Sequence, residues 1–358
     1  MKSFFKDLKV VELANVLAGP AVGMFFAELG AEVIKIENKL TGGDITRSWK
    51  LPVEDKKLKT SAYFASVNWN KKSIFLDLNY KKDKQKVYDL ICDADIVITN
   101  YKKGDDKKLG MDYATLCKIN PKIIYAHISG YGENSNRTAY DLVLQAETGF
   151  MFMNGTPTSG PVKMPVAIID LMAAHQLKEG ILLALINKMK TGKGSKVTVS
   201  LFDSAIASLA NQASNYLMAN HNPEPIGSLH PNIAPYGEIF TTKDKRQIVL
   251  AIGSDKQFQR LCEILNLKEV AFNVKFSTNS ERVKNRIELF EVINEKIAKC
   301  SSKKLLAELI EFDVPAGTIK SIKEMFSDID SASYILSSNE KKNKNKAVKS
   351  ITFNFSNY

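Results

Sequence analysis

The stretch LKVVELANVLAGPAVGMFFAELGAEVIKIE, residues 8–37, decides the fold. Val10, Val11 and Leu13 predict a short apolar strand, and the tripeptide Ala-Gly-Pro at 18–20 interrupts it. Small and apolar residues over 21–29 favour a helix closed by a glycine, and residues 33–36 predict a second strand. A strand, a helix and a strand in this order predict a parallel βαβ unit with helices on the sheet faces.

The same alternation continues to about residue 220. Further strands are predicted at 73–78, 96–98, 123–126 and 197–201, and helices at 81–92, 171–189 and 204–217. The fold class is therefore α/β, with a Rossmann-like open parallel sheet in a large domain that spans residues 1–220.

The segment Asn-Pro-Glu-Pro-Ile-Gly at 222–227 is typical of a linker, and the pattern changes after it. Strands at 237–242 and 247–252 are followed by helices near 255–266, 280–299 and 302–312. This order predicts a smaller α+β domain over 221–313, after which residues 314–358 return to the large domain.

Composition excludes several classes of protein. Of the 358 residues, 44% are hydrophobic and 25% charged, which is typical of a globular protein. No apolar run approaches the ~20 residues of a membrane span, and no secretory signal is recognisable, so a cytoplasmic location is expected. The four cysteines and four histidines show no metal-ligand spacing, so no metal is expected.

The net charge of +11 is spread along the chain and predicts a solvated surface compatible with a phosphate-rich ligand, without nucleic-acid or membrane partners. The one concentrated run of lysines, at 341–346, has no interleaved aromatic residue and predicts a mobile loop.

Three segments carry candidate chemistry. Asn15-Val16-Leu17 lies between a strand and a helix, where open α/β sheets bind ligands; a plain tight turn is the alternative. Asn100-Tyr101 follows a strand and is followed by two lysines, so it could stack on a base beside phosphates or form a solvated loop. Asp170 precedes a long helix, either as an N-cap or as a nucleophilic carboxylate.

These segments occur in order with other motifs that together resemble the class III CoA-transferase (CaiB/BaiF) family. The motifs are LGAEVIKIE at 29–37, NKKS at 70–73, NPKIIY at 120–125, SGYG at 129–132 and TGKG at 191–194. The resemblance covers nearly the whole chain. It implies a Rossmann-like large domain, a smaller second domain and a homodimer whose subunits interlock like chain links.

The resemblance also implies the site residues. Asp170 would carry CoA as an aspartyl-CoA thioester, with coenzyme A and acyl-CoA as substrates and no permanently bound cofactor. Tyr140 would lie close to the acyl group. The positions implied to bind CoA are Asn15, Val16, Leu17, Leu76, Asn100, Tyr101, Lys108 and Arg137. A basic residue common in the family after the second strand is replaced by Asn38, followed by Lys39.

Two other functions are open at this point. An α-methylacyl-CoA racemase of the same superfamily needs a His–Asp pair, and Tyr140 stands where its histidine would be, before Asp141. Tyrosine, with an unperturbed pKa of about 10, is a poor base near neutral pH. A non-catalytic CoA-binding protein would keep the fold and lose the nucleophile, whereas Asp170 is present.

Overall fold

The computed structural model describes residues 4–337 and 346–356, which divide into two compact units. The first unit comprises residues up to 151, 163–221 and 332 onward, and the second comprises 152–162 and 222–331. The lysine-rich run at 341–346 lies outside the described residues, except for Lys346. The predicted domain boundaries at 220 and 313 and the predicted interlocked homodimer stay predictions.

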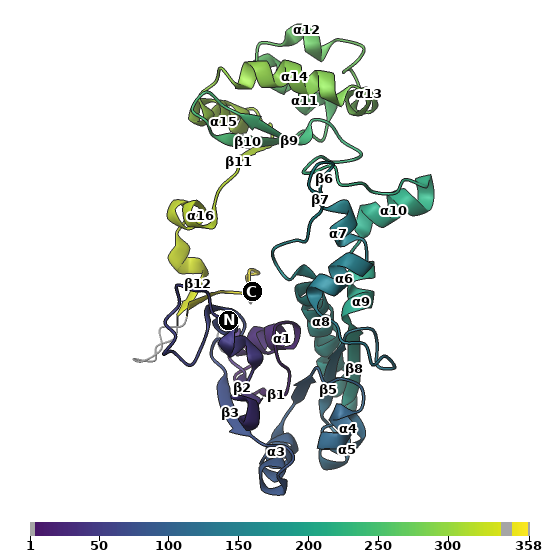
Figure 1. The fold of residues 1–358 in the computed structure, drawn as a ribbon, viewed down its shortest axis with the longest axis vertical. Helices are drawn as coiled ribbons and strands as arrows, with labels where there is room; N and C mark the ends of the chain where they lie inside the picture. The colour runs from purple at the N-terminus through teal and green to yellow at the C-terminus, as the bar shows by residue number, and fades with distance from the viewer. Residues whose placement is uncertain (1–3, 338–345, 357–358) are drawn as a thin grey trace. The chain divides into compact units, whose positions relative to one another are not determined.

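A parallel sheet of six strands forms the centre of the described part of the first unit (Figure 1). Its order across the sheet is β3-β2-β1-β4-β5-β8. The strands are β1 (Lys9–Glu12), β2 (Glu32–Asn38), β3 (Lys72–Leu76), β4 (Ile96–Thr99), β5 (Ile124–Ser129) and β8 (Ser195–Ser200). All neighbouring pairs run parallel, which confirms the predicted Rossmann-like α/β class.

Helices cover both faces of this sheet. On one face, α1 (Ala18–Glu28) and α8 (Ile168–Thr191) pack on residues such as Val10, Ile96 and Ile98. On the other face, α3 (Lys81–Asp93) and α5 (Tyr113–Ile119) pack on Val11 and Val97. Because successive residues of a strand point to opposite faces, consecutive apolar residues in β1 and β4 fill two cores.

Shorter elements of the first unit lie around this sheet. They are η1 (Lys39–Thr41), η2 (Ile45–Ser48), α2 (Ala62–Ala65), α4 (Asp105–Leu109), α6 (Asp141–Glu147), α7 (Phe150–Met153, which runs into the second unit), α9 (Leu201–Ala207) and α10 (Ala210–Ala219). The C-terminal part adds η3 (Ser331–Tyr334, at the boundary) and the hairpin β12 (Ile335–Ser337) with β13 (Lys346–Val348). After this hairpin, Ile351 packs into the same core as α1 and α8.

Several helix boundaries differ from the prediction. The helix predicted at 280–299 is two helices, Asn279–Lys284 and Arg286–Ile297, and the helix predicted at 171–189 is α8, which begins at Ile168. Helix α1 begins at Ala18, so Ala-Gly-Pro opens the helix instead of preceding it. Proline is tolerated in the first turn because its missing N–H would have no intrahelical acceptor there. The predicted helix 204–217 is two helices, α9 and α10, and Ala210, the first residue of α10, has a φ of 47°. A backbone irregularity of this kind leaves the apolar pattern intact and is therefore invisible in the sequence.

The second unit is the smaller α+β part. An antiparallel sheet ordered β11-β10-β9 is formed by β9 (Tyr236–Thr241), β10 (Gln247–Ala251) and β11 (Ala316–Thr318). Its helices are α11 (Asp255–Ile264), α12 (Lys268–Ala271), α13 (Asn279–Lys284), α14 (Arg286–Ile297), α15 (Ser302–Glu311) and α16 (Ile322–Asp328), and β6 (Gly155–Thr156) pairs with β7 (Gly160–Pro161). The helices pack an apolar core against the sheet around Phe240, Ile248 and Leu250.

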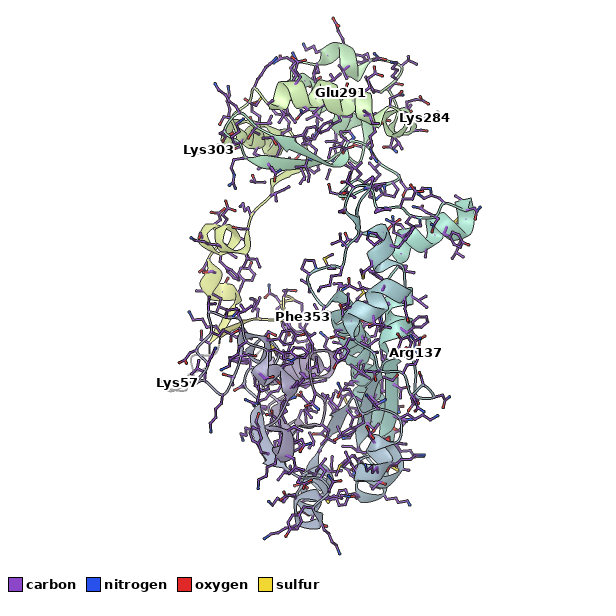
Figure 2. The ribbon with its side chains drawn as sticks, in the orientation of Figure 1. Lys57, Arg137, Lys284, Glu291, Lys303 and Phe353 are labelled. Atoms are coloured by element: carbon purple, nitrogen blue, oxygen red, sulfur yellow. The ribbon has the colours of Figure 1, made fainter. Side chains whose placement is uncertain are left out.

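The basic charge is spread over both units. Figure 2 shows lysines projecting from the first unit at Lys57 and from the second at Lys284 and Lys303. Among the described residues, no helix combines the length and apolar character needed to cross a membrane.

Candidate active site

A cavity of about 760 Å³ opens at the carboxyl ends of β1, β4 and β5 in the first unit. Strands β1 and β4 are neighbours in the sheet, and β2 and β5 lie on their outer sides, so the connections diverge here. Such a divergence is where open α/β sheets bind their ligands. The predicted site residues that line the cavity are Asn15, Val16, Leu17, Asn100, Tyr101, Arg137, Tyr140 and Asp170.

The side chain of Asn100 fixes the turn after β1. Its Oδ1 accepts a hydrogen bond from the N–H of Asn15 at 3.0 Å, and its Nδ2 donates to the carbonyl of Asn15 at 2.8 Å. One amide therefore satisfies both backbone groups of Asn15. The neighbouring Tyr101 also lines the cavity, and burial raises the pKa of its hydroxyl, which keeps it protonated.

Asp170 lies in the first turn of α8 with only 8% of its surface exposed. The N-cap of α8 is Ala167, so the interpretation of Asp170 as an N-cap is wrong. In the described part of the chain, no hydrogen bond to the Asp170 carboxylate is found. Burial raises its pKa to about 7, and the negative charge of Asp141 adds to the rise. A buried carboxylate without a partner is costly, and such groups gather at functional sites.

Asp141, the second buried carboxylate, has the partners that Asp170 lacks. Its Oδ1 accepts from the N–H of Ile169 at 2.8 Å, which satisfies a free donor of the first turn of α8. Its Oδ2 accepts from Nε2 of Gln145 at 2.5 Å, and Oε1 of Gln145 accepts from the N–H of Met164 at 2.8 Å. This network holds Asp141 in place beside Asp170 and fixes the start of α8.

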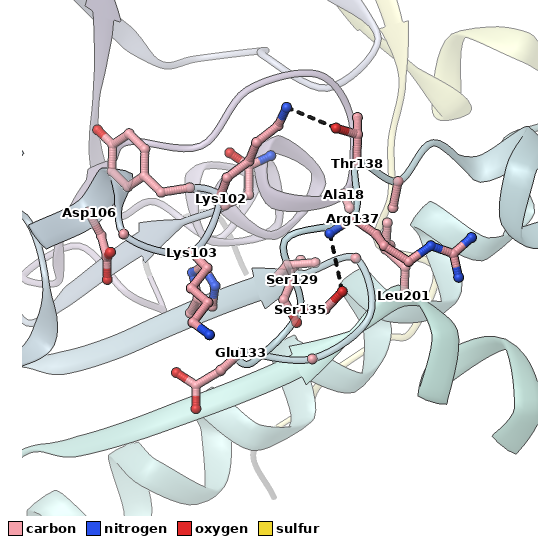
Figure 3. A pocket seen from close by; sticks show the side chains of 18 of the residues that line it. Ala18, Lys102, Lys103, Asp106, Ser129, Glu133, Ser135, Arg137, Thr138 and Leu201 are labelled. Atoms are coloured by element: carbon pink, nitrogen blue, oxygen red, sulfur yellow. Dashed lines mark hydrogen bonds between the residues drawn. The ribbon is translucent and has the colours of Figure 1, made fainter. Parts of the chain in front are cut away.

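Cationic side chains line the outer part of the cavity (Figure 3). They are Lys102, Lys103, Lys107, Arg137 and Lys196. Nζ of Lys102 donates to Oγ1 of Thr138 at 2.9 Å, as Figure 3 shows. The Arg137 guanidinium pairs with Glu147 at 2.5 Å and stacks on Tyr131. Four acidic side chains, Asp106, Asp112, Glu133 and Asp170, line the cavity as well, and Lys196 pairs with Glu133. The lining therefore keeps a small positive excess, which favours an anionic ligand.

A smaller cavity of about 140 Å³ lies beside the larger one and shares Asn15 and Tyr101 with it. Leu76, at the end of β3, is 3% exposed and lines this cavity, as does Asn38 at the end of β2. Lys39 is absent from the described lining of both cavities. Lys108 lies exposed on α4 and lines neither cavity, whereas its neighbour Lys107 lines the larger one.

Some residues of the site were not predicted as such. Asp141 was considered only as the partner of a racemase histidine, and Gln145, His127 and Lys196 were not assigned to this site. His127 lines the cavity with its Nδ1 2.8 Å from Oγ1 of Thr99, and burial lowers its pKa. The alternation of the exposed Lys196 and Thr198 with partly buried valines in β8 is a sequence signal for one open sheet face.

Among the described residues, no cluster of three or more His, Cys, Asp or Glu side chains could hold a metal ion. The arrangement instead offers a buried carboxylate at the base of a cavity, a tightly held turn next to it and cations at its opening. This combination suits covalent chemistry on an anionic substrate.

This fold and this site define a class of proteins, the CaiB/BaiF proteins. The crystal structure of a CaiB/BaiF family protein from Brucella suis is similar, with a TM-score of 0.83 and 37% identity, and the match covers 97% of this chain and 91% of that one. The family model described as CoA-transferase family III matches residues 5–357. The chain therefore belongs to CoA-transferase family III.

Two curated relatives have named activities. The succinate–glutarate CoA-transferase of Agrobacterium fabrum is 40% identical over 90% of this chain and 81% of its own length. The succinyl-CoA:glutarate CoA-transferase of Homo sapiens is 37% identical over 90% of this chain and 73% of its own length. The resemblance inferred from the motifs is thus confirmed, and the chain is a CoA-transferase by family.

Proposed function

We propose that this enzyme moves CoA from an acyl-CoA donor to a carboxylic acid through an aspartyl-CoA thioester on Asp170. The observation that carries the proposal is the Asp170 carboxylate itself, which is buried, has no hydrogen-bond donor among the described residues and lines the large cavity. A nucleophile of this kind needs no general base, because the ionised carboxylate attacks directly.

The reaction divides into four exchanges. The Asp170 carboxylate attacks the thioester carbonyl of the donor, and the C–S bond breaks to give a mixed anhydride and CoA thiolate. The thiolate then attacks the Asp170 carbonyl of the anhydride, which releases the donor acid and leaves aspartyl-CoA. The acceptor carboxylate attacks this thioester to give a second anhydride, and the thiolate attacks its acyl carbonyl. The products are the new acyl-CoA and free Asp170, with no net proton change.

The environment of Asp170 supports both halves of this cycle. A pKa near 7 leaves a large fraction of the carboxylate ionised at neutral pH, and the rise in pKa shows that burial disfavours that charge, which makes the ionised form more reactive. The side chain of Leu17 does not cap α1, and the backbone N–H groups of Ala18 and Gly19 in its first turn would stabilise the oxyanions of the tetrahedral intermediates. Leu17 and Ala18 in this turn line the same cavity as Asp170.

For the substrates, we propose succinyl-CoA as donor and a dicarboxylic acid of four or five carbons as acceptor. The names of the two relatives support this assignment, because both act on succinate or succinyl-CoA and on glutarate. Cationic side chains around the cavity also favour substrates that keep a negative charge at their far end.

The test is a transfer assay with defined pairs. Incubation with succinyl-CoA and glutarate is expected to produce glutaryl-CoA and succinate in equal amounts, measured by liquid chromatography and mass spectrometry. Acetyl-CoA with glutarate serves as the matched donor without a distal carboxylate and is expected to react at least about tenfold more slowly, an effect of the size of one lost charged contact.

Absence of acyl-CoA exchange with any donor would contradict the proposal. Incorporation of deuterium from deuterated water into a 2-methylacyl-CoA would then favour the racemase. Binding of CoA without either reaction would favour the non-catalytic binding protein.

A further inference from the structure

Val16, in the turn that lines the cavity, has a left-handed backbone conformation with a φ of 74°. This region is sterically unfavourable for a β-branched residue, whose side chain crowds the neighbouring carbonyl. Such a conformation costs on the order of a tenfold to hundredfold population loss and persists only where the surroundings impose it. Some group in the structure must therefore hold Val16.

The carboxylate of Asp44 is that group. Its Oδ2 and Oδ1 accept from the N–H of Val16 at 3.1 Å and 3.3 Å. Asp44 is only 2% exposed and is itself fixed, since its Oδ1 accepts from the N–H and the hydroxyl of Thr46 at 3.0 Å and 2.8 Å. Its backbone N–H donates to the carboxylate of Glu37 at 2.9 Å.

A buried ion network joins Asp44 to both sides of the turn. Nζ of Lys35 lies 3.2 Å from Asp44 Oδ2 and donates to Glu12 at 2.9 Å and to the carbonyl of Ala14, before the turn, at 2.6 Å. Nζ of Lys71 donates to Glu12 at 2.8 Å and to the carbonyl of Pro20, after the turn, at 2.7 Å.

The four charged side chains of this network, Glu12, Lys35, Asp44 and Lys71, are at most 1% exposed. The two lysines balance the two carboxylates. Helix α1 leaves room for Glu12 through Gly23, where a Cβ would lie 1.8 Å from Glu12 Oε2. A buried ion network is commonly no more stable than apolar side chains of the same volume. Its place around a strained turn of the cavity wall indicates a role beyond stability.

We propose that Asp44, braced by Glu12, Lys35 and Lys71, is a positioning residue that keeps Val16 left-handed and so holds the first turn of α1 in the geometry that CoA transfer requires. Asp44 is not among the residues that line the cavity and acts through Val16. The inference rests on the proposed function, because the geometry it protects is that of the CoA-transfer site.

The test uses glycine at position 16, because glycine adopts positive φ without strain. Asp44→Ala is expected to lower kcat for CoA transfer about 100-fold, with a change in KM for the acyl-CoA of less than about fivefold. Adding Val16→Gly to Asp44→Ala is expected to recover at least about tenfold of the lost kcat. Val16→Gly alone is assayed in parallel, and the recovery is expressed relative to its kcat, because Val16 itself lines the cavity.

A matched control removes the same kind of strain elsewhere. Asn266 in the second unit also has a positive φ, 55°, so Asn266→Gly tests general stabilisation in the Asp44→Ala background. Equal recovery by Asn266→Gly, or no recovery by Val16→Gly, would overturn the inference, since a merely structural role of Asp44 predicts those results. If Asp44→Ala does not fold, Asp44→Asn replaces it, with a loss of about tenfold and the same rescue.

Hydrogen exchange separates this inference from the proposed function. The amides of residues 14–19 are expected to exchange at least about tenfold faster in Asp44→Ala and to return toward the wild-type rate with Val16→Gly. Wild-type protein that transfers no CoA would contradict the proposed function. Unchanged exchange in Asp44→Ala would contradict the positioning role, whether or not the wild type is active.

Discussion

Replacing Asp170 with asparagine is expected to abolish CoA transfer while making the protein more stable at pH 8. The amide cannot form the mixed anhydride, so kcat is expected to fall at least about 10⁴-fold, as when a covalent nucleophile is removed from an enzyme. The affinity for CoA is expected to change less than about threefold, because asparagine has the same shape.

The gain in stability follows from the raised pKa of Asp170, from 3.8 to about 7. Because the folded protein binds this proton more tightly than the unfolded chain, the stabilising contribution is complete below pH 3.8 and is lost as the pH rises through 7. Asparagine does not titrate. The free energy of unfolding of the variant therefore exceeds that of the wild type by an amount that grows over this pH range and reaches up to about 4 kcal/mol. Chemical denaturation at pH 5 and pH 8 measures it.

Asp203 offers the matched control. It occupies the third position of α9, as Asp170 does in α8, but its carboxylate accepts a hydrogen bond from Oγ of Ser200 at 2.6 Å. Asp203→Asn is expected to keep kcat within about threefold and to gain no stability between pH 5 and pH 8. An Asp170→Asn protein that still transfers CoA, or one that is less stable than the wild type at pH 8, would contradict this account of the site.

The second large effect is expected from Glu12→Gln. Glu12 is the shared partner of Lys35, at 2.9 Å, and Lys71, at 2.8 Å, and all three side chains are at most 1% exposed. Burial already lowers the pKa of Lys71 to about 8. Removing the Glu12 charge leaves one buried lysine without a counter-charge, which is expected to lower the free energy of unfolding by about 3–5 kcal/mol.

Two variants separate this effect from the loss of any ion pair. Glu32→Gln removes the half-exposed pair with Lys72 at 2.7 Å and is expected to cost less than about 1 kcal/mol. The double variant Glu12→Gln with Lys71→Met restores the charge balance and is expected to recover at least half of the loss. If Glu12→Gln lowers the free energy of unfolding, measured with denaturant, by no more than Glu32→Gln does, the network is not a charge-balanced unit.

The parallel sheet could be predicted because its signals are local. Most strands contain a short apolar run, and these runs alternate with helical patterns, so the order of elements alone predicts the class. The start of α1 was harder to predict from the sequence, because Ala-Gly-Pro is compatible both with a turn and with the first turn of a helix. The choice depends on tertiary contacts, such as those of Pro20 with Lys71, which no local pattern carries.

The site was predictable only in part, for the same reason. Two short segments, Asn15-Val16-Leu17 and Asn100-Tyr101, were predicted as site residues, and in the structure both line the same cavity at the end of neighbouring strands. The ion network around Asp44 could not be predicted, because its four members come from separate segments and charged residues are usually exposed. The role of Asp170 as an N-cap was open in the sequence, and only the position of Ala167 decides it.

The most direct test of the central claim is to trap the aspartyl thioester. The wild type is incubated with succinyl-CoA, treated with hydroxylamine, digested and mapped by mass spectrometry, with Asp170→Asn in parallel. A hydroxamate that depends on succinyl-CoA is expected on Asp170 of the wild type, and none is expected at that position in the variant. A protein that transfers CoA at full rate but yields no modified Asp170, or a donor-dependent hydroxamate on another carboxylate, would contradict the central claim.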